Sequence, residues 1–231
     1  MNKNSRPRRS VLYMPGSNER ALEKGKMLAA DGLILDLEDA VAPISKLKAR
    51  EQIAKALRDG GYGKREIVVR VNSLDSQWGD DDLKMAATIG ADAILLPKVE
   101  SKDDILQAEK ILNGSGGAED LPLWCMMETP LGILHAEEVA FASPRIGCLV
   151  LGTSDLAKDL NAHHTLNRMP FLTSLEFKDT EFIRILLFKI LFLKVSVKIF
   201  VFSEFDNNLF FFLIALIISN LSEKKDFFLY S

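Results

Sequence analysis

The chain has 231 residues, of which 26% are charged and 48% are hydrophobic, and its formal net charge is −3. These values exclude an intrinsically disordered chain and a nucleic-acid-binding protein that depends on bulk positive charge. Two cysteines, Cys125 and Cys148, are too few for a disulfide framework or a four-thiolate zinc site, and their apolar surroundings predict core positions. The first ten residues lead into patterned sequence without an apolar signal segment, so the expected location is the cytoplasm.

Up to about Leu175, apolar β-rich segments alternate with segments of helical spacing. The expected strands lie within Ser10–Gly16, Gly32–Asp39, Glu66–Asn72, Ala91–Glu100, Leu121–Pro130 and Ile146–Asp155. Helices are expected between them, among others at Asn18–Asp31, Ile44–Gly61 and Ser101–Leu112. The last of these begins with a serine cap and acidic residues, which is typical of a helix start.

The expected strands are almost continuously apolar, which indicates a parallel sheet covered on both faces. An open doubly wound sheet and a (β/α)8 barrel both fit this alternation. No glycine-rich nucleotide motif follows the first strand, and polar residues gather at the carboxyl ends of the strands, where a barrel carries its site. These residues are Asp36, Glu38, Asp39, Arg70, Asn72, Lys98, Glu100, Glu128, Ser154 and Asp155. We predict an α/β fold, an incomplete TIM (β/α)8-type barrel that has six of its eight units.

Residues 176–231 differ in composition from the rest of the chain. The last glycine is Gly152, the last proline is Pro170, and all but one of the 14 phenylalanines lie at Phe171 or later. Folded α/β domains need residues that end their elements and tolerate positive φ. We therefore expect 176–231 to be a low-complexity apolar tail outside the native fold, such as a frameshift or a splicing error would produce, and an aggregation hazard.

A membrane-associated or interaction fragment driven by this tail is the alternative of another class. Its longest uncharged apolar run, Leu209–Ser219, is too short to cross about 30 Å of hydrocarbon as a helix. Lys189, Lys194 and Lys198 would place charge inside the bilayer. The sequence therefore disfavours a membrane role.

Glu128 and Asp155 each follow an apolar run that we expect to be buried. If they end neighbouring parallel strands, their carboxylates lie side by side at the mouth of the barrel. Two carboxylates without a nearby histidine or thiolate favour a hard ion, Mg²⁺ or Mn²⁺. The structural alternatives are that Asp155 caps a helix and that Glu128 pairs with Lys98.

Arg70 lies inside an apolar strand, so its charge must be paired. It could form a structural ion pair with Asp36 or Glu38, or it could hold a substrate carboxylate or a developing enolate oxygen. The role of the acidic residues after the second strand has two interpretations as well: they could orient Arg70 and water, or they could cap the next helix.

The histidines do not form a recognisable catalytic or metal motif. The sequence has neither H-E-x-x-H nor G-x-S-x-G. His163 and His164 are adjacent, so their side chains point apart, and His135 is expected to be a surface or packing residue. A Ser–His hydrolase therefore receives no support.

The sequence resembles a known protein family in six motifs. They occur in this order along the chain: VLYMPGSNERALEK, DGLILDLEDAVAP, VVRVNS, ADAILLPKVES, METPLGIL and LVLGTSDLAKDL. From about Arg9 to about Leu175 the sequence resembles the HpcH/HpaI aldolase and citrate lyase β-subunit family. Within that family it is most similar to the CitE-like malyl-CoA, methylmalyl-CoA and citramalyl-CoA lyases. The resemblance implies one barrel domain over residues 9–175.

This resemblance also implies a reaction and its residues. Glu128 and Asp155 would hold Mg²⁺, and Arg70 would bind the substrate. The enzyme would cleave a 3-hydroxyacyl-CoA into an acyl-CoA and a 2-oxo acid. The family uses its first loop near CoA and substrate, and the matching residues here are Tyr13, Asn18 and Lys24. Such proteins commonly assemble as homotrimers or homohexamers.

The chain departs from the family after Leu175. The resemblance implies that this region should supply the last two strands with a G-F-D-G-K-like segment, and the sequence after Leu175 matches neither. It also implies a C-terminal acidic residue that handles the proton at the thioester carbon, and no residue of the tail can be assigned that role. We therefore expect the chain as written to be unstable and inactive. A citrate lyase β-subunit, working on a citryl thioester of acyl carrier protein, is the second enzymatic interpretation.

Overall fold

The computed structural model of the chain describes residues 8–118, 120–166, 168–171, 174, 198–202 and 214–216. Each of the six expected strand segments contains one strand. They are β1 (Val11–Pro15), β2 (Gly32–Asp36), β3 (Glu66–Arg70), β4 (Ala93–Leu96), β5 (Leu123–Met127) and β6 (Ile146–Gly152). The helices are α1 (Glu19–Gly25), α2 (Lys46–Asp59), α3 (Gly79–Thr88), α4 (Lys102–Gly114), α5 (Pro130–Leu134), α6 (Ala136–Phe141) and α7 (Thr153–Asp159), with 3-10 turns η2 (Pro43–Ser45) and η3 (Met169–Phe171).

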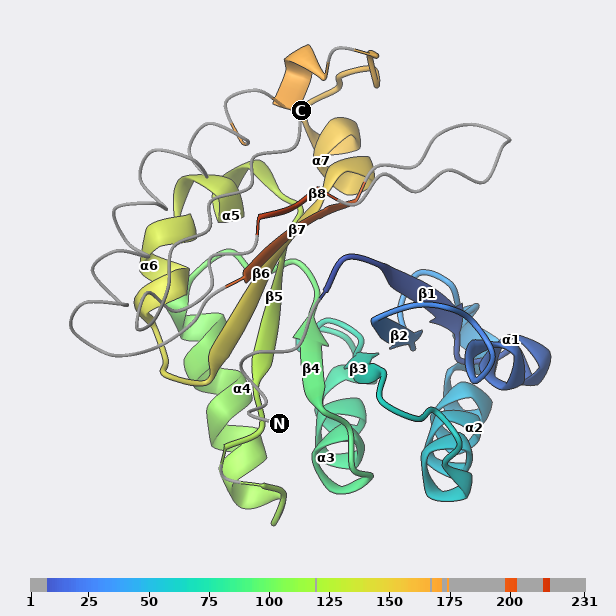
Figure 1. The fold of residues 1–231 in the computed structure, drawn as a ribbon. Helices are drawn as coiled ribbons and strands as arrows, with labels where there is room; N and C mark the ends of the chain where they lie inside the picture. Colours follow the sequence, from blue (N-terminus) through green and yellow to red (C-terminus); the bar gives the residue numbers. More distant parts are fainter. Residues whose placement is uncertain are drawn as a thin grey trace, which may run out of the picture.

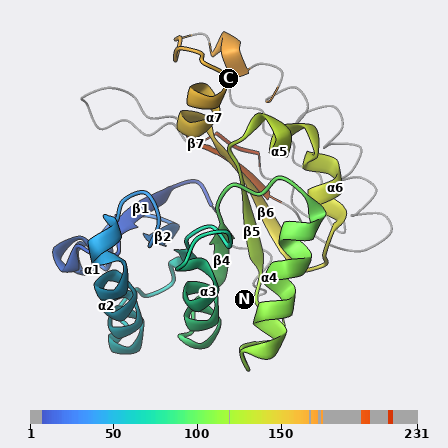
Figure 2. The ribbon, with the colours of Figure 1, turned by 180° about the vertical axis from the view of Figure 1, so that it is seen from behind.

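Strands β1 to β6 form one parallel sheet in sequential order. The register pairs Asp36 with Arg70 across β2 and β3, and Met127 with Leu151 across β5 and β6. Figures 1 and 2 show that this sheet curls and that the helices cover its outer side. The predicted α/β fold is confirmed, as six parallel strands in a curled half-barrel.

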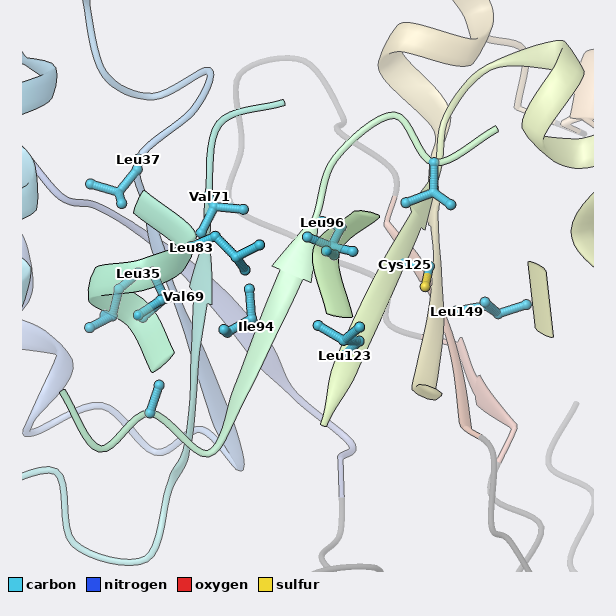
Figure 3. Close-up of a cluster of buried hydrophobic side chains, with 14 of the residues drawn as sticks. Leu35, Leu37, Val69, Val71, Leu83, Ile94, Leu96, Leu123, Cys125 and Leu149 are labelled. Carbon is cyan, nitrogen blue, oxygen red and sulfur yellow. The ribbon is translucent and has the colours of Figure 1, made fainter. Parts of the chain in front are cut away.

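Side chains of the buried strands alternate between two apolar clusters. Leu35 of β2 belongs to the cluster between the sheet and the helices, which also contains Leu83 of α3 (Figure 3). Leu33 of β2 is a member of the same cluster. Ile34, between Leu33 and Leu35 in sequence, belongs to the cluster on the inner side of the curved sheet, together with Trp124. Successive side chains of a strand point to opposite faces, so an almost continuously apolar strand is buried on both.

Both cysteines lie in this core, as predicted. Cys125 is in the outer cluster and Cys148 is in the inner one, and both side chains are buried.

Two helix ends follow signals in the sequence. Ser101 caps α4, and the carboxylate of Asp104 accepts a hydrogen bond from the Ser101 backbone N–H at 2.9 Å. Helix α2 ends at Asp59, and its C-cap residue Gly60 has a φ of 67°, a conformation that favours glycine.

Arg8 closes the inner cluster at the amino-terminal end of the strands. Its guanidinium donates to both carboxylate oxygens of Glu66, with one contact at 2.6 Å, and it lies 4.8 Å from the centre of the Trp124 ring. The charges of Arg8 and Glu66 are both buried, and this ion pair gives each of them the counter-charge that burial requires. Within the described part of the chain, the other buried charged side chains lie toward the opposite end of the sheet.

Two segments of the 176–231 tail are described. Strand β7 (Lys198–Phe202) pairs in parallel with β6, and β8 (Ile214–Leu216) pairs antiparallel with β7. The rest of the tail, with Lys189, Lys194 and most of the Leu209–Ser219 run, lies outside the described residues. The division of the chain into a barrel domain and a tail stays a prediction. None of the described helices is long and apolar enough to cross a bilayer.

Candidate active site

The candidate site lies at the carboxyl ends of the parallel strands. Asp36 and Arg70 are the last residues of β2 and β3, and Lys98 lies two residues beyond β4. Glu128 follows β5 directly, and Asp155 lies in the first turn of α7, just after β6. Parallel strands in sequential order bring these ends to one edge of the sheet, where Figure 1 shows the loops that lead into the helices.

Arg70 forms a buried two-point ion pair with Asp36. Its Nε and Nη2 donate to the two carboxylate oxygens at 2.7 and 2.6 Å. Burial by itself would lower the pKa of Arg70, but the hydrogen bonds and charge of Asp36 raise it above its usual value. The structure therefore contains the ion pair that the apolar setting of Arg70 requires, and Asp36 is the main partner.

The third nitrogen of Arg70, Nη1, faces two further carboxylates. It lies 2.9 Å from Oε2 of Glu38 and 3.3 Å from Oδ2 of Asp39. Burial raises the pKa of Glu38, Arg70 partly offsets this, and the charge of Asp39 adds to the rise. Nη1 is therefore the part of the guanidinium that is not committed to Asp36.

The acidic loop after β2 is held from behind by Lys46. Its Nζ donates to the carbonyl oxygens of Leu37 and Glu38, each at 2.7 Å. Asp36 accepts hydrogen bonds from the backbone N–H groups of Glu38 and Ala40. These contacts fix the backbone that carries Glu38, so its carboxylate faces the site.

Lys98 connects three of the carboxylates. Its backbone N–H donates to Oε1 of Glu128 at 2.9 Å, and its Nζ contacts Oδ2 of Asp155 at 2.9 Å and Oε1 of Glu38 at 3.2 Å. Burial by itself would lower the pKa of Lys98, but the hydrogen bond to Asp155 and the nearby carboxylate charges raise it above its usual value. Glu128 thus contacts the backbone of Lys98, whereas Asp155 pairs with its ammonium.

Glu128 is only 2% exposed, and burial raises its pKa to about 7. The negative charge of Glu38 adds to this rise, and Lys98 and Arg70 oppose it. The side chain fits only because residue 152 is a glycine. A Cβ atom there would lie 2.6 Å from the Glu128 Cβ and 2.8 Å from its Oε2.

Asp155 does not cap a helix. Gly152 occupies the N-cap position of α7, and Asp155 is the third helical residue. The capping interpretation is therefore wrong, because the helix begins before Asp155 and its side chain is directed to Lys98 instead.

The three residues assigned to the first loop lie in different places. Tyr13 is in β1, and the guanidinium carbon of Arg70 lies 5.0 Å from its ring centre. Asn18 is exposed and caps α1 by accepting the N–H of Ala21 at 3.1 Å. Lys24 is exposed in the last turn of α1. The structure thus places Tyr13 against the site, while a CoA contact of any of the three stays a prediction.

The contacts of His135 and His164 are with groups other than the carboxylates of the site. Nδ1 of His135 lies 2.8 Å from the carbonyl oxygen of Glu100. His163 and His164 are exposed after α7, and the His164 ring packs 5.2 Å from that of Phe171. Within the described part of the chain, no three or more His, Cys, Asp or Glu side chains are grouped to hold a metal ion. Histidine ligands therefore have no support here.

Sequence reasoning found the acidic residues and Arg70 but gave Lys98 too small a role. The available signal was a lysine two residues after the buried strand β4, at the same edge as the acids. Its connecting position depends on a backbone φ of 50°, which sequence patterns do not reveal for a residue other than glycine.

A curled parallel sheet with charged residues at its carboxyl edge defines the class of α/β-barrel proteins that carry their site at that edge. Residues 9–175 match the HpcH/HpaI aldolase/citrate lyase family, and the chain belongs to this family. The predicted family is confirmed.

Two curated relatives illustrate the extent of the match. The chain is 48% identical over 169 residues to the (3S)-malyl-CoA thioesterase of Cereibacter sphaeroides (strain ATCC 17025 / ATH 2.4.3), covering 73% of this chain and 57% of that protein. It is 39% identical over 166 residues to citrate lyase subunit beta of Escherichia coli (strain K12), covering 70% of this chain and 55% of that protein. The chain thus spans about half the length of these relatives.

Solved structures agree on the fold. The citrate lyase beta subunit of M. tuberculosis complexed with oxaloacetate and magnesium superposes with a TM-score of 0.63 at 24% identity, covering 85% of this chain and 79% of that one. RipC from Yersinia pestis gives a TM-score of 0.62 at 23% identity, covering 85% and 76%.

Proposed function

We propose that this chain carries the metal and substrate site of an enzyme that acts on CoA thioesters of hydroxy acids. The proposed reaction is cleavage of a 3-hydroxyacyl-CoA of the malyl-CoA type into an acyl-CoA and a 2-oxo acid. The observation that carries the proposal is the convergence of Glu128 and Asp155, from neighbouring strand ends, on Lys98. A homo-oligomeric assembly and a cytoplasmic location stay predictions.

The donor set of the site fits Mg²⁺, and Mn²⁺ as its substitute. Glu128 and Asp155 offer carboxylate oxygens, and Mg²⁺ is commonly held by one or two carboxylates plus water and substrate oxygens. Gly152 provides the space that the Glu128 side chain occupies. The solved M. tuberculosis citrate lyase beta subunit, which shares the fold, is complexed with oxaloacetate and magnesium, which agrees with this choice.

When bound, Mg²⁺ would act as a Lewis acid on substrate oxygens. The chain itself supplies a fixed cation, Arg70, whose Nη1 is directed into the site while Asp36 holds the rest of the guanidinium. In the proposed cleavage the substrate hydroxyl loses its proton, the carbon–carbon bond breaks, and its electron pair forms the enolate of the acyl-CoA, which then takes up a proton. Glu38 is the carboxylate that we assign to the hydroxyl proton, because burial raises its pKa and it lies between Arg70 and Lys98.

Thioester hydrolysis is the second candidate. The relative that is 48% identical is named a (3S)-malyl-CoA thioesterase, and the chain is less similar, at 39%, to citrate lyase subunit beta. This difference favours a malyl-CoA-type substrate over a citryl thioester of acyl carrier protein. Hydrolysis would add water and release malate and free CoA, whereas cleavage would release glyoxylate and acetyl-CoA.

Incubation with malyl-CoA and Mg²⁺ separates these reactions. Because we expect the 231-residue chain to be inactive as written, the assay also uses a restored chain, in which the family's last two strands follow Leu175. Cleavage predicts glyoxylate, measured as its phenylhydrazone, and an equal amount of acetyl-CoA without free thiol. Free thiol together with malate would instead identify hydrolysis. Absence of both product pairs from the restored chain would refute the proposed function, whereas their absence from the 231-residue chain alone would agree with its expected inactivity.

A matched pair of variants in α7 tests the role of the site. In the restored chain, Asp155→Asn should abolish turnover, since it removes one of the two carboxylates. Asp159→Asn removes an exposed carboxylate from the same helix and should leave turnover as in the wild type. Equal turnover in both variants would contradict the assigned site.

A further inference from the structure

Lys98 has a backbone conformation that lysine rarely adopts. Its φ is 50°, in the left-handed region, which is uncommon for residues other than glycine and often marks functional positions. This conformation directs the N–H to Glu128 while the side chain reaches Asp155 and Glu38. One residue thus contacts both carboxylates that we assign to the metal.

The ammonium of Lys98 balances negative charge that Arg70 does not balance. Arg70 is largely committed to Asp36 through two of its nitrogens. Lys98 provides the ammonium that pairs with Asp155 and with the second oxygen of Glu38. Without it, carboxylates that are buried or half-buried would lie together with too little positive charge.

The ammonium is also able to leave. The Lys98 side chain is 41% exposed and its partner Asp155 is 28% exposed, so the pair is open to solvent. Exposed ion pairs of this kind are weak and exchange readily. In contrast, the Arg70–Asp36 pair is buried and remains in place.

We propose that Lys98 is a built-in counter-ion of the metal-free site and that its Nζ leaves Asp155 when the divalent cation binds. This inference rests on the proposed function, because it requires Asp155 to be a metal ligand. An ammonium beside Asp155 and a divalent ion bound to the same carboxylate would repel each other strongly at such short range. Lys98 therefore stabilises the site without metal and weakens metal affinity by competition.

Titration calorimetry with Mn²⁺ tests the competition. Lys98→Asn removes the charge, and asparagine tolerates positive φ, so the backbone conformation is preserved. We expect it to bind Mn²⁺ about two- to fivefold more tightly than the wild type, which corresponds to the loss of one weak exposed ion pair. Lys98→Arg keeps the charge and should bind no more tightly than the wild type. Lys110→Asn, on an exposed position of α4, controls for the change in net charge.

Amine acetylation followed by mass spectrometry tests the movement itself. In the wild type, saturating Mg²⁺ should increase the labelling rate of Lys98 severalfold, because Nζ is released from Asp155, and should leave that of Lys110 unchanged.

Thermal unfolding gives a third readout. Without metal, the melting temperature of Lys98→Asn should be lower than that of Lys110→Asn. Mn²⁺ should raise the melting temperature of Lys98→Asn by more than it raises that of Lys110→Asn.

The outcomes separate the inference from the proposed function. If wild-type chain gives no binding heat with Mn²⁺ or Mg²⁺, the proposed metal site is refuted, and the inference falls with it. If the wild type binds the ion but Lys98→Asn binds it equally or more weakly, or if labelling of Lys98 does not rise, the counter-ion role alone is refuted.

Discussion

Replacement of Glu128 by glutamine should change how the free energy of unfolding depends on pH. Burial and the charge of Glu38 raise the pKa of Glu128 from 4.5 to about 7 in the folded chain. A group with a raised pKa stabilises the fold in its protonated form. Its contribution is complete below pH 4.5 and is lost as the pH rises through about 7.

The size of this effect follows from the two pKa values. Each pKa unit corresponds to about 1.4 kcal/mol, so the wild type should lose about 2 to 3 kcal/mol relative to Glu128→Gln between pH 5 and pH 8. Glutamine does not titrate, and its side-chain oxygen can still accept the N–H of Lys98. The other titrating groups are present in both proteins, so the difference isolates Glu128.

Urea unfolding in EDTA, followed by tryptophan fluorescence from pH 5 to pH 8, measures this difference. Glu137→Gln, at an exposed position of α6, should behave as the wild type does across the range. Parallel curves for the wild type and Glu128→Gln would refute the reasoning, because they would mean that burial does not destabilise the ionised Glu128 carboxylate in the folded chain.

Two further variants test the packing of the site. Arg70→Met leaves Asp36 buried without its cation, so it should lower the free energy of unfolding by about 3 to 5 kcal/mol in urea titrations. The additional change Asp36→Leu removes the unpaired charge and should recover much of this loss. Failure to recover it would contradict the pairing role of Arg70. Gly152→Ala should displace Glu128 and weaken Mg²⁺ binding at least tenfold by calorimetry, whereas Gly114→Ala, whose Cβ has no atom within 4 Å, should bind normally.

Part of the site could be derived from the sequence because burying a charge is costly. Arg70 lies in the apolar run of β3, so a nearby carboxylate had to pair with it, and Asp36 and Glu38 were the candidates. The structure contains both contacts and shows that Asp36 takes two nitrogens and Glu38 one. Sequence alone could not divide the guanidinium between them, because that depends on the register of β2 and β3.

The convergence on Lys98 could not be read from the sequence. Lys98 lies 30 residues from Glu128 and 57 from Asp155 along the chain, and its contacts depend on a left-handed backbone that no pattern indicates. The start of α7 is a similar case, since the position of the first helical residue decides whether Asp155 caps the helix or lies inside its first turn.

The amino-acid sequence by itself determined the six strand–helix units, the burial of both faces of the sheet and the family, because these depend on local apolar patterns and on motifs within single segments. The tertiary structure alone decided which charges meet. Side-chain contacts at the mouth join residues from five different strand ends, and their distances depend on the curl and register of the whole sheet rather than on any local preference.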